Sequence, residues 1–302
     1  MNSASFTLPG LVAATFTPLK PNGDLDIAPI PSMVQWLHEQ GIRGLYVLGS
    51  TGEGVSMTFA ERCEAAASFV AAARGKMPVV IQVGCESLQQ AGELAAHAQE
   101  VGADAISAVS PLYFKPDSVP CLVESMAQIA AQAPKLPFYY YHIPSVTGVG
   151  LNMLEFLRLG HDRIPTLRGI KYSSPNVPEY QACLEFAGGE FDILWGTDEM
   201  LLSALIVGAK GAVGSTYNYA AGVYHKLLQA FQAGDMEAAR RWQAKSQAIV
   251  RAFVPYGPRA AQKAIMGMVG HDCGPARLPL VSLSPERSAA LRADLEAVGF
   301  FE

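Results

Sequence analysis

The sequence alternates short apolar segments with longer segments rich in Ala, Leu, Glu and Gln. Continuous apolar segments of strand length predict a parallel sheet that the intervening helices bury on both faces. Eight segments have the composition of such strands: 11–16, 44–49, 79–84, 105–110, 138–142, 167–171, 192–195 and 211–214. Helical patterns lie between them, near 29–40, 58–74, 87–101, 118–132, 152–160, 176–187 and 198–208.

Eight strand–helix units favour a (β/α)8 TIM barrel, an α/β fold, over an open doubly wound sheet, which the pattern alone leaves as an alternative. Thr58 and Glu61 have the spacing of a capping box, which supports one of the predicted helix starts. Residues 222–302 are rich in helical patterns. One of these helices would close the barrel, and the rest would form a C-terminal helical extension from about residue 222. No linker-like tract divides the chain, so we expect a single domain over residues 1–302.

The composition limits the classes of partner. Half of the 302 residues are hydrophobic and the formal net charge is −5, which predicts a large core and disfavours nucleic-acid binding. The apolar runs stop well short of the about 18 residues of a membrane span, and the N-terminus lacks the pattern of a signal peptide. The five cysteines form no C-x-x-C pair, which disfavours disulfides and structural zinc. We expect a cytoplasmic protein with no nucleic-acid or membrane partner.

Polar residues follow the predicted strands. In a (β/α)8 barrel the carboxyl ends of the strands form one mouth, and the chemistry lies there. We therefore expect the side chains at these ends to converge. They supply hydroxyls, one amine and two carboxylates, and the residues are Ser50, Thr51, Tyr113, Tyr141, His142, Lys171, Gly196, Asp198, Glu199 and Ser215.

Lys171 is the candidate nucleophile. Of the nine lysines, only Lys171 ends a strand that should be buried on both faces. A lysine at an arbitrary position would more often extend its charged end to solvent or pair with an acidic neighbour. At a barrel strand end the side chain enters a pocket instead, where burial lowers the pKa of the amine. A neutral amine can attack a carbonyl and form a Schiff base.

The motif GSTGEG (49–54) follows the second predicted strand. It matches neither the P-loop nor the G-x-G-x-x-G pattern. It is either a glycine-rich turn or an anion site, in which backbone N–H groups and the hydroxyls of Ser50 and Thr51 hold a carboxylate. An anion site would suit a substrate whose carboxylate is next to a reactive carbonyl.

Three successive tyrosines, 139–141, end the fifth predicted strand. Side chains alternate between the two faces of a strand, so Tyr140 should face away from Tyr141 and pack against other aromatic groups. Tyr141 comes last, beside the mouth, where its phenol can carry a proton. Ser50 and Tyr113 are candidate relay partners.

The neighbouring residues allow more than one role. His142 should face away from Tyr141, which favours a hydrogen-bonding structural histidine over a base or a ligand. Asp198 and Glu199 either stabilise the start of a helix through its dipole or accept hydrogen bonds from a polyhydroxylated ligand. The sequence has no H-E-x-x-H motif and no obvious set of three ligands, so we expect no metal.

Four segments in this order resemble the dihydrodipicolinate synthase / N-acetylneuraminate lyase superfamily of Schiff-base aldolases. They are GSTGEG (49–54), YHIPSVTG (141–148), GIKYSS (169–174) and GAVGSTYNY (211–219). FYYYHIP, WGTDE and QKAIMGMVG are most similar to the lyase branch, and the similarity extends from TFTP (15–18) to the C-terminal helices. The resemblance implies a (β/α)8 barrel, usually a homotetramer without metal or organic cofactor, that cleaves N-acetylneuraminate to N-acetylmannosamine and pyruvate.

The resemblance also implies roles for the matching residues. Lys171 would form the imine with pyruvate, Tyr141 would shuttle the proton, and Ser50 and Thr51 would bind the carboxylate of the pyruvyl group. Tyr113 matches a position from which some members send a tyrosine into the site of the neighbouring subunit. The sugar-acid portion would be held by Ser173, Gly196, Asp198, Glu199, Gly214 and Ser215.

Val146 distinguishes the branches of this family. The synthases typically carry an arginine in the segment that is PSVTG here, and this arginine holds the carboxylate of their second substrate. Valine cannot form that ion pair, which favours the lyase. The alternatives are another pyruvate-dependent aldolase, similar to dihydrodipicolinate synthase or acting on 2-keto-3-deoxy sugar acids, and a non-catalytic sugar-acid sensor with the same fold.

Overall fold

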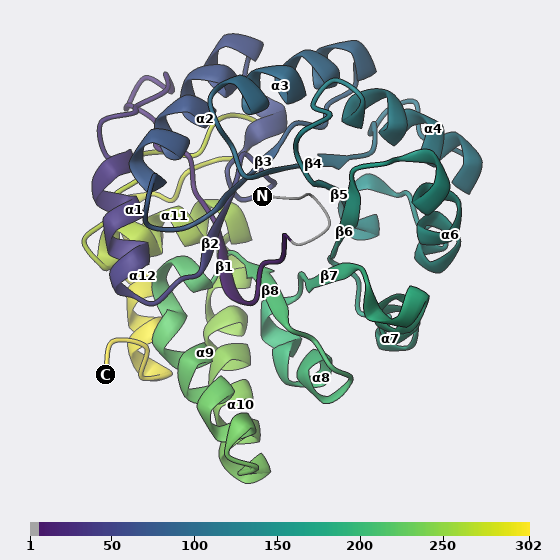
Figure 1. The fold of residues 1–302 in the computed structure, drawn as a ribbon. Helices are drawn as coiled ribbons and strands as arrows, with labels where there is room; N and C mark the ends of the chain where they lie inside the picture. The colour runs from purple at the N-terminus through teal and green to yellow at the C-terminus, as the bar shows by residue number, and fades with distance from the viewer. Residues whose placement is uncertain (1–5) are drawn as a thin grey trace.

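A computed structural model describes residues 6–302 and contains a closed barrel of eight parallel strands (Figure 1). The strands pair in sequence order, and β8 returns to β1. They are β1 (Gly10–Ala14), β2 (Gly44–Val47), β3 (Val79–Gln82), β4 (Ala105–Val109), β5 (Phe138–His142), β6 (Leu167–Tyr172), β7 (Asp192–Trp195) and β8 (Gly211–Gly214). The prediction of a (β/α)8 barrel is confirmed, and the open doubly wound alternative is wrong.

The helices form a layer around this barrel, as Figure 1 shows. In chain order they are α1 (Ile30–Glu39), α2 (Phe59–Ala73), α3 (Leu88–Glu100), α4 (Val119–Ala130), α5 (Pro144–Thr147), α6 (Met153–Arg163), α7 (Val177–Glu185), α8 (Leu201–Ile206), α9 (Tyr217–Gln232), α10 (Met236–Phe253), α11 (Pro258–Met268) and α12 (Pro285–Ala297). After α9, the helix α10 packs on α9, and α12 packs on α10 and α11. Within residues 6–302, none of the helices has the length and hydrophobicity needed to cross a membrane.

Several boundaries differ from the sequence-based predictions. The strands β1 to β4 end one or two residues before their predicted ends. The strand β6 continues past Lys171 to Tyr172. The helix after β8 begins at Tyr217 instead of near residue 222. The amide of Asn218 donates to backbone oxygens of Ala14 and Ser215, which ties the first turn of this helix to the barrel. The helix α5 was not predicted, because its four residues are too few to show a helical period.

Strand side chains alternate between the barrel interior and the layer under the helices. Tyr139 and Tyr141 belong to the interior cluster. Tyr140 faces outward and packs on Phe156 of α6, with ring centres 4.8 Å apart. The predicted alternation of the three tyrosines is therefore confirmed, and it puts Tyr141 at the mouth.

A buried ion pair connects α11 to the loop that follows β2. Lys263 Nζ lies 2.8 Å from Glu53 Oε1, and both side chains are only 3% exposed. Glu53 also accepts a hydrogen bond from the backbone N–H of Arg277, and Lys263 donates to the carbonyl oxygen of Pro275. Removing one partner of such a pair typically costs about 3–5 kcal/mol, because the other charge stays buried alone. The pair thus fixes the C-terminal helices against a loop at the barrel mouth.

Candidate active site

A cavity of about 220 Å³ lies at the carboxyl ends of the strands. Its walls come from the ends of β1, β2 and β5 to β8 and from the first two turns of α11. The structure therefore brings together strand ends that are far apart in the sequence. The predicted site residues that line this cavity are Ser50, Thr51, Tyr141, Lys171, Ser173, Gly196, Asp198 and Ser215.

Lys171 is buried in this cavity and is only 4% exposed. Within residues 6–302, no carboxylate oxygen lies within 4.0 Å of its Nζ. The ring centres of Tyr46 and Tyr141 lie 3.8 and 4.0 Å from this nitrogen. Burial lowers the pKa of Lys171, and the charge and hydroxyl of Tyr141 and the charge of Asp198 oppose this shift. An amine in this setting loses its proton more readily than an exposed lysine does.

Lys263 is a second buried lysine, and the sequence analysis did not find it. Its position on a helical pattern gave no sign of burial, because the pattern does not show which face of α11 meets the barrel. The carboxylate of Glu53 balances its charge at 2.8 Å. The two buried lysines therefore differ in kind: Lys263 belongs to an ion pair, whereas Lys171 faces aromatic rings.

Tyr141 and Ser50 meet above the amine. The oxygen of Ser50 lies 3.4 Å from the phenolic oxygen of Tyr141, and either hydroxyl can donate. Thr51 lines the same cavity. These hydroxyls form a polar wall next to Lys171, suited to a carboxylate and to the transfer of a proton.

Asp198 begins a short 3-10 turn after β7 and is buried beside the cavity. Its Oδ2 accepts hydrogen bonds from the backbone N–H and the hydroxyl of Thr216, at 2.8 and 2.7 Å. Gly214 leaves room for this carboxylate, because a Cβ at residue 214 would overlap it. Burial, reinforced by the charge of Glu199, raises the pKa of Asp198 to about 6.

A second cavity, of about 300 Å³, adjoins the first and extends the polar surface. Both cavities are lined by Ser173, Gly196, Asp198 and Ser215, whereas Glu199 lines only the second. A Cβ at Gly196 would overlap the hydroxyl of Ser173, so the glycine keeps the wall open. The two cavities give a small ligand a continuous series of hydroxyl and carboxylate partners.

Tyr113 does not enter the cavity of its own chain. It lies in the loop after β4 and is 81% exposed. Its ring packs edge-on against Phe114, which is 83% exposed. Of the two predicted relay partners, only Ser50 lies near Tyr141 within one chain.

The sequence analysis missed the part of the cavity that comes from α11. Pro258, Arg259 and Gln262 line it. They lie on a helix after the barrel, so a search of strand ends could not find them. A basic residue in the first turn of a helix is unfavourable for the helix dipole, and this signal could have drawn attention to Arg259. Thr216 follows Ser215 at a strand end and could have been included.

His142 is buried outside the barrel interior, 5.1 Å from the ring centre of Tyr172. It faces away from Tyr141, as predicted. The sequence predicted a hydrogen-bonded histidine, but Nδ1 of His142 has no hydrogen-bond partner within residues 6–302. The rings of Tyr140 and Tyr172 pack against the imidazole instead. Burial lowers the pKa of His142 to about 4.

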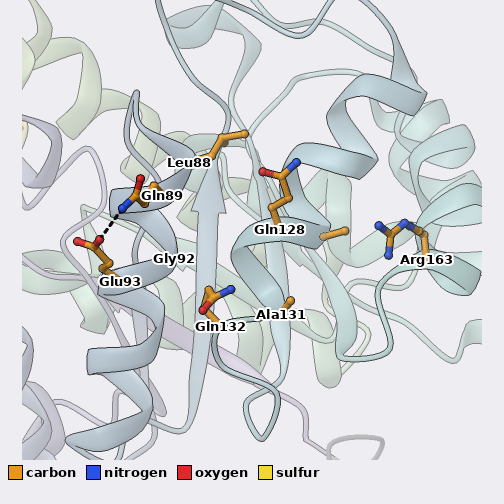
Figure 2. A pocket seen from close by; sticks show the side chains of 9 residues that line it. Leu88, Gln89, Gly92, Glu93, Gln128, Ala131, Gln132 and Arg163 are labelled. Carbon is orange, nitrogen blue, oxygen red and sulfur yellow. Dashed lines mark hydrogen bonds between the residues drawn. The ribbon is translucent and has the colours of Figure 1, made fainter.

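A separate hollow lies on the outer surface between α3 and α4 (Figure 2). It measures about 580 Å³ and is lined mainly by amides and small side chains. Gln89 there donates to Glu93 at 3.2 Å, and Arg163 pairs with Glu124. No predicted site residue lines this hollow, so we assign the chemistry to the barrel mouth. In the part of the chain that the structure describes, no three His, Cys, Asp or Glu side chains are grouped as metal ligands.

The barrel, with a buried amine and an adjacent pair of hydroxyls at its mouth, defines a candidate carbonyl-attacking site. The chain belongs to the dihydrodipicolinate synthetase family, whose sequence profile matches residues 7–298.

Individual relatives within this family are similar over nearly the whole chain. N-acetylneuraminate lyase A of Xenopus laevis is 45% identical over 287 residues, which are 93% of each chain. The structure of Proteus mirabilis N-acetylneuraminate lyase superposes with a TM-score of 0.95 at 39% identity, covering 98% of this chain and 100% of that one. A structure described as a catalytic lysine mutant of Ruminococcus gnavus sialic acid aldolase superposes with a TM-score of 0.91 at 28% identity, covering 97% of this chain and 96% of that one.

The raised pKa of Asp198 predicts a pH-dependent cost to stability. The unfolded carboxyl loses its proton near pH 4, whereas the folded one keeps it until about pH 6. Stability from this group therefore falls as the pH rises through that window. Asp198→Asn keeps an oxygen for Thr216 but carries no charge. We expect the variant to gain up to about 3 kcal/mol over the wild type at pH 7.5, and much less at pH 4.5, in unfolding experiments at both values. A stability difference that does not change with pH would contradict this.

Proposed function

We propose that the protein is a class I aldolase, a carbon–carbon lyase, that cleaves N-acetylneuraminate to N-acetylmannosamine and pyruvate through a Schiff base on Lys171. The observation that carries the proposal is the buried amine of Lys171, which faces Tyr141 and has no carboxylate partner within residues 6–302. The similarity to proteins named N-acetylneuraminate lyase supports the choice of substrate. The similar R. gnavus sialic acid aldolase has a catalytic lysine, which supports a lysine as the nucleophile here.

The reaction begins when the neutral Nζ of Lys171 attacks the C2 ketone carbon of the open-chain sugar acid. The hydroxyl of the resulting carbinolamine takes a proton from Tyr141 and leaves as water, which gives an iminium ion. Ser50 and Thr51 bind the neighbouring carboxylate, which orients the ketone towards the amine. Only an uncharged amine can attack, so the burial that lowers the pKa of Lys171 increases the reactive fraction.

The iminium then accepts the electrons of the C3–C4 bond. Tyr141, which gave up its proton in the dehydration step and lies with its oxygen 3.4 Å from that of Ser50, now takes the proton from the C4 hydroxyl as that bond breaks and the aldehyde of N-acetylmannosamine forms. The electron pair leaves an enamine on Lys171. Protonation at C3 and addition of water release pyruvate and restore the amine, so the water lost at imine formation is taken up again.

The rest of the sugar acid extends towards α11 and the end of β7. Asp198 and Glu199 accept hydrogen bonds from its hydroxyl groups. Backbone and side-chain groups of four further residues also accept hydrogen bonds from this portion, and these residues are Ser173, Gly196, Gly214 and Ser215. The two adjoining cavities support this assignment. Arg259 brings a cation to the mouth from α11, so Val146 alone does not rule out the synthase reaction.

We also propose a cytoplasmic homotetramer. All five cysteines are free, which suits a reducing compartment. Tyr113 and Phe114 form an exposed aromatic pair beside the mouth, which suits burial against a second copy of the chain and would bring Tyr113 near the site of that copy. Sedimentation velocity tests this, because a monomer at micromolar concentration would refute the tetramer.

A coupled assay of pyruvate release tests the substrate. It compares N-acetylneuraminate with 2-keto-3-deoxy sugar acids and with the condensation of pyruvate and an aldehyde substrate of the synthases. We expect the highest kcat/KM with N-acetylneuraminate. A higher value with another acid would reassign the substrate, and binding without pyruvate release would favour the sensor.

Lys171→Arg tests the nucleophile. A guanidinium stays charged and cannot form an imine, so we expect no detectable pyruvate release and no labelling by pyruvate with borohydride. The exposed Lys135 offers a matched control, and Lys135→Arg should retain both signals. Labelling of the Lys171→Arg variant at the wild-type level would refute the assignment.

Tyr141→Phe tests the proton carrier. Removing the hydroxyl from the reacting atoms should lower kcat by about 10²-fold or more, as expected for general acid–base catalysis. Tyr140→Phe is the control, since the hydroxyl of Tyr140 is buried on the other face of β5 and has no hydrogen-bond partner within residues 6–302. Equal turnover in the two variants would show that another group moves the proton.

A further inference from the structure

The amine of Lys171 lies between two aromatic rings. Its Nζ is 3.8 Å from the ring centre of Tyr46 on β2 and 4.0 Å from that of Tyr141 on β5. The two ring centres are 5.5 Å apart, and the planes meet at 74°. The proposed mechanism uses the hydroxyl of Tyr141 but gives no role to Tyr46.

Tyr46 is held so that only its ring is offered to the amine. The side chain is 1% exposed, and its hydroxyl donates to Oγ of Ser107 at 2.9 Å. The residue at position 49 of the GSTGEG motif must be small for this arrangement, because a Cβ on Gly49 would lie 2.8 Å from Cε1 of the Tyr46 ring. The hydroxyl is therefore already bonded away from Lys171, and the ring face is the contacting surface.

Few charges face the amine. The titratable groups that act on it are Tyr46 from β2, Tyr141 from β5 and the more distant Asp198 after β7. The face of an aromatic ring carries a partial negative charge and attracts a cation within about 6 Å, most strongly where water is excluded. The centres of both rings lie within 4.0 Å of the nitrogen, close enough to stabilise a positive charge on it.

We propose that Tyr46 is a further catalytic residue, whose ring face binds the positively charged nitrogen of Lys171, first in the ammonium ion and then in the iminium ion. The inference rests on the proposed Schiff-base chemistry. Attack by the neutral amine gives a neutral carbinolamine, whose hydroxyl takes up a proton and leaves as water, so the positive charge returns to the same nitrogen. The ring therefore stabilises the two charged states relative to the neutral amine and the carbinolamine between them.

This role makes a prediction that depends on pH. Where the amine is protonated, ammonium plus pyruvate becomes iminium plus water with no change in charge. Removing the ring then destabilises the ammonium and the iminium forms of Lys171 equally. Where the amine is neutral, only the iminium loses its stabilisation. The ring thus favours the Schiff base at high pH and leaves the equilibrium unchanged at low pH.

Tyr46→Leu tests this by removing the ring. The measurement is the pyruvate concentration that gives half-maximal Schiff base, trapped with borohydride across a pH series. Above the pKa of the amine we expect this concentration to rise about 30-fold, which corresponds to about 2 kcal/mol for a desolvated cation–π contact. Well below that pKa it should stay within about threefold of the wild type, and the midpoint of the pH profile should fall by about one unit or more.

Tyr46→Phe keeps the ring without the hydroxyl and should restore the pH profile of trapping. Gly49→Ala provides a second route, because the added methyl displaces the Tyr46 ring without deleting it. At high pH this variant should also need a higher pyruvate concentration for half-maximal Schiff base. Circular dichroism verifies that each variant is folded. If Tyr46→Leu does not fold, Gly49→Ala decides.

Two results would overturn the role of Tyr46 but leave the proposed function intact. In the first, a folded variant with the ring deleted or displaced has the same pH series as the wild type. In the second, such a variant needs more pyruvate by the same factor at every pH. The second result would indicate a purely structural role. A wild-type protein that forms no adduct at Lys171 would overturn the proposed function and this inference together.

Discussion

The candidate active site depends on the burial of one amine that has no carboxylate oxygen within 4.0 Å in the part of the chain that the structure describes. Lys171 is near the end of a strand in a closed parallel barrel, where both faces are covered and the strand end opens into a cavity. Water is largely excluded there, so the ammonium form is destabilised. Two aromatic rings take the place of a carboxylate partner, and they limit this destabilisation without holding the proton in an ion pair.

The contrast with Lys263 shows why the partner matters. Lys263 is buried to a similar degree, but Oε1 of Glu53 lies 2.8 Å from its amine and pairs with it. That lysine connects the C-terminal helices to the loop after β2, which also carries Ser50. The same residue type therefore serves structure at one position and, as we propose, chemistry at the other, and the difference lies in the neighbouring side chain.

Much of this arrangement could be predicted from the sequence, because it follows from local patterns. Eight apolar runs separated by helical patterns were enough for the barrel, and strand periodicity was enough to separate Tyr140 from Tyr141. The contribution of α11 could not be predicted in this way, since Arg259 and Lys263 reach the barrel mouth through tertiary packing of helices that follow the barrel. The contact between Tyr46 and Lys171 joins β2 to β6 across the barrel interior, and no local pattern records which interior side chains touch. The exposure of Tyr113 also depends on how the loop after β4 leaves the barrel.

Peptide mapping of the wild-type protein after reduction with borohydride in the presence of pyruvate tests the central claim most directly. Both buried lysines are present in one sample. Lys263 is therefore an internal control, because it is buried but its amine is paired with Glu53. The account predicts a reduced pyruvyl adduct on the peptide that contains Lys171 and none on the peptide that contains Lys263. An adduct on another lysine in place of Lys171, or no adduct at saturating pyruvate, would contradict it.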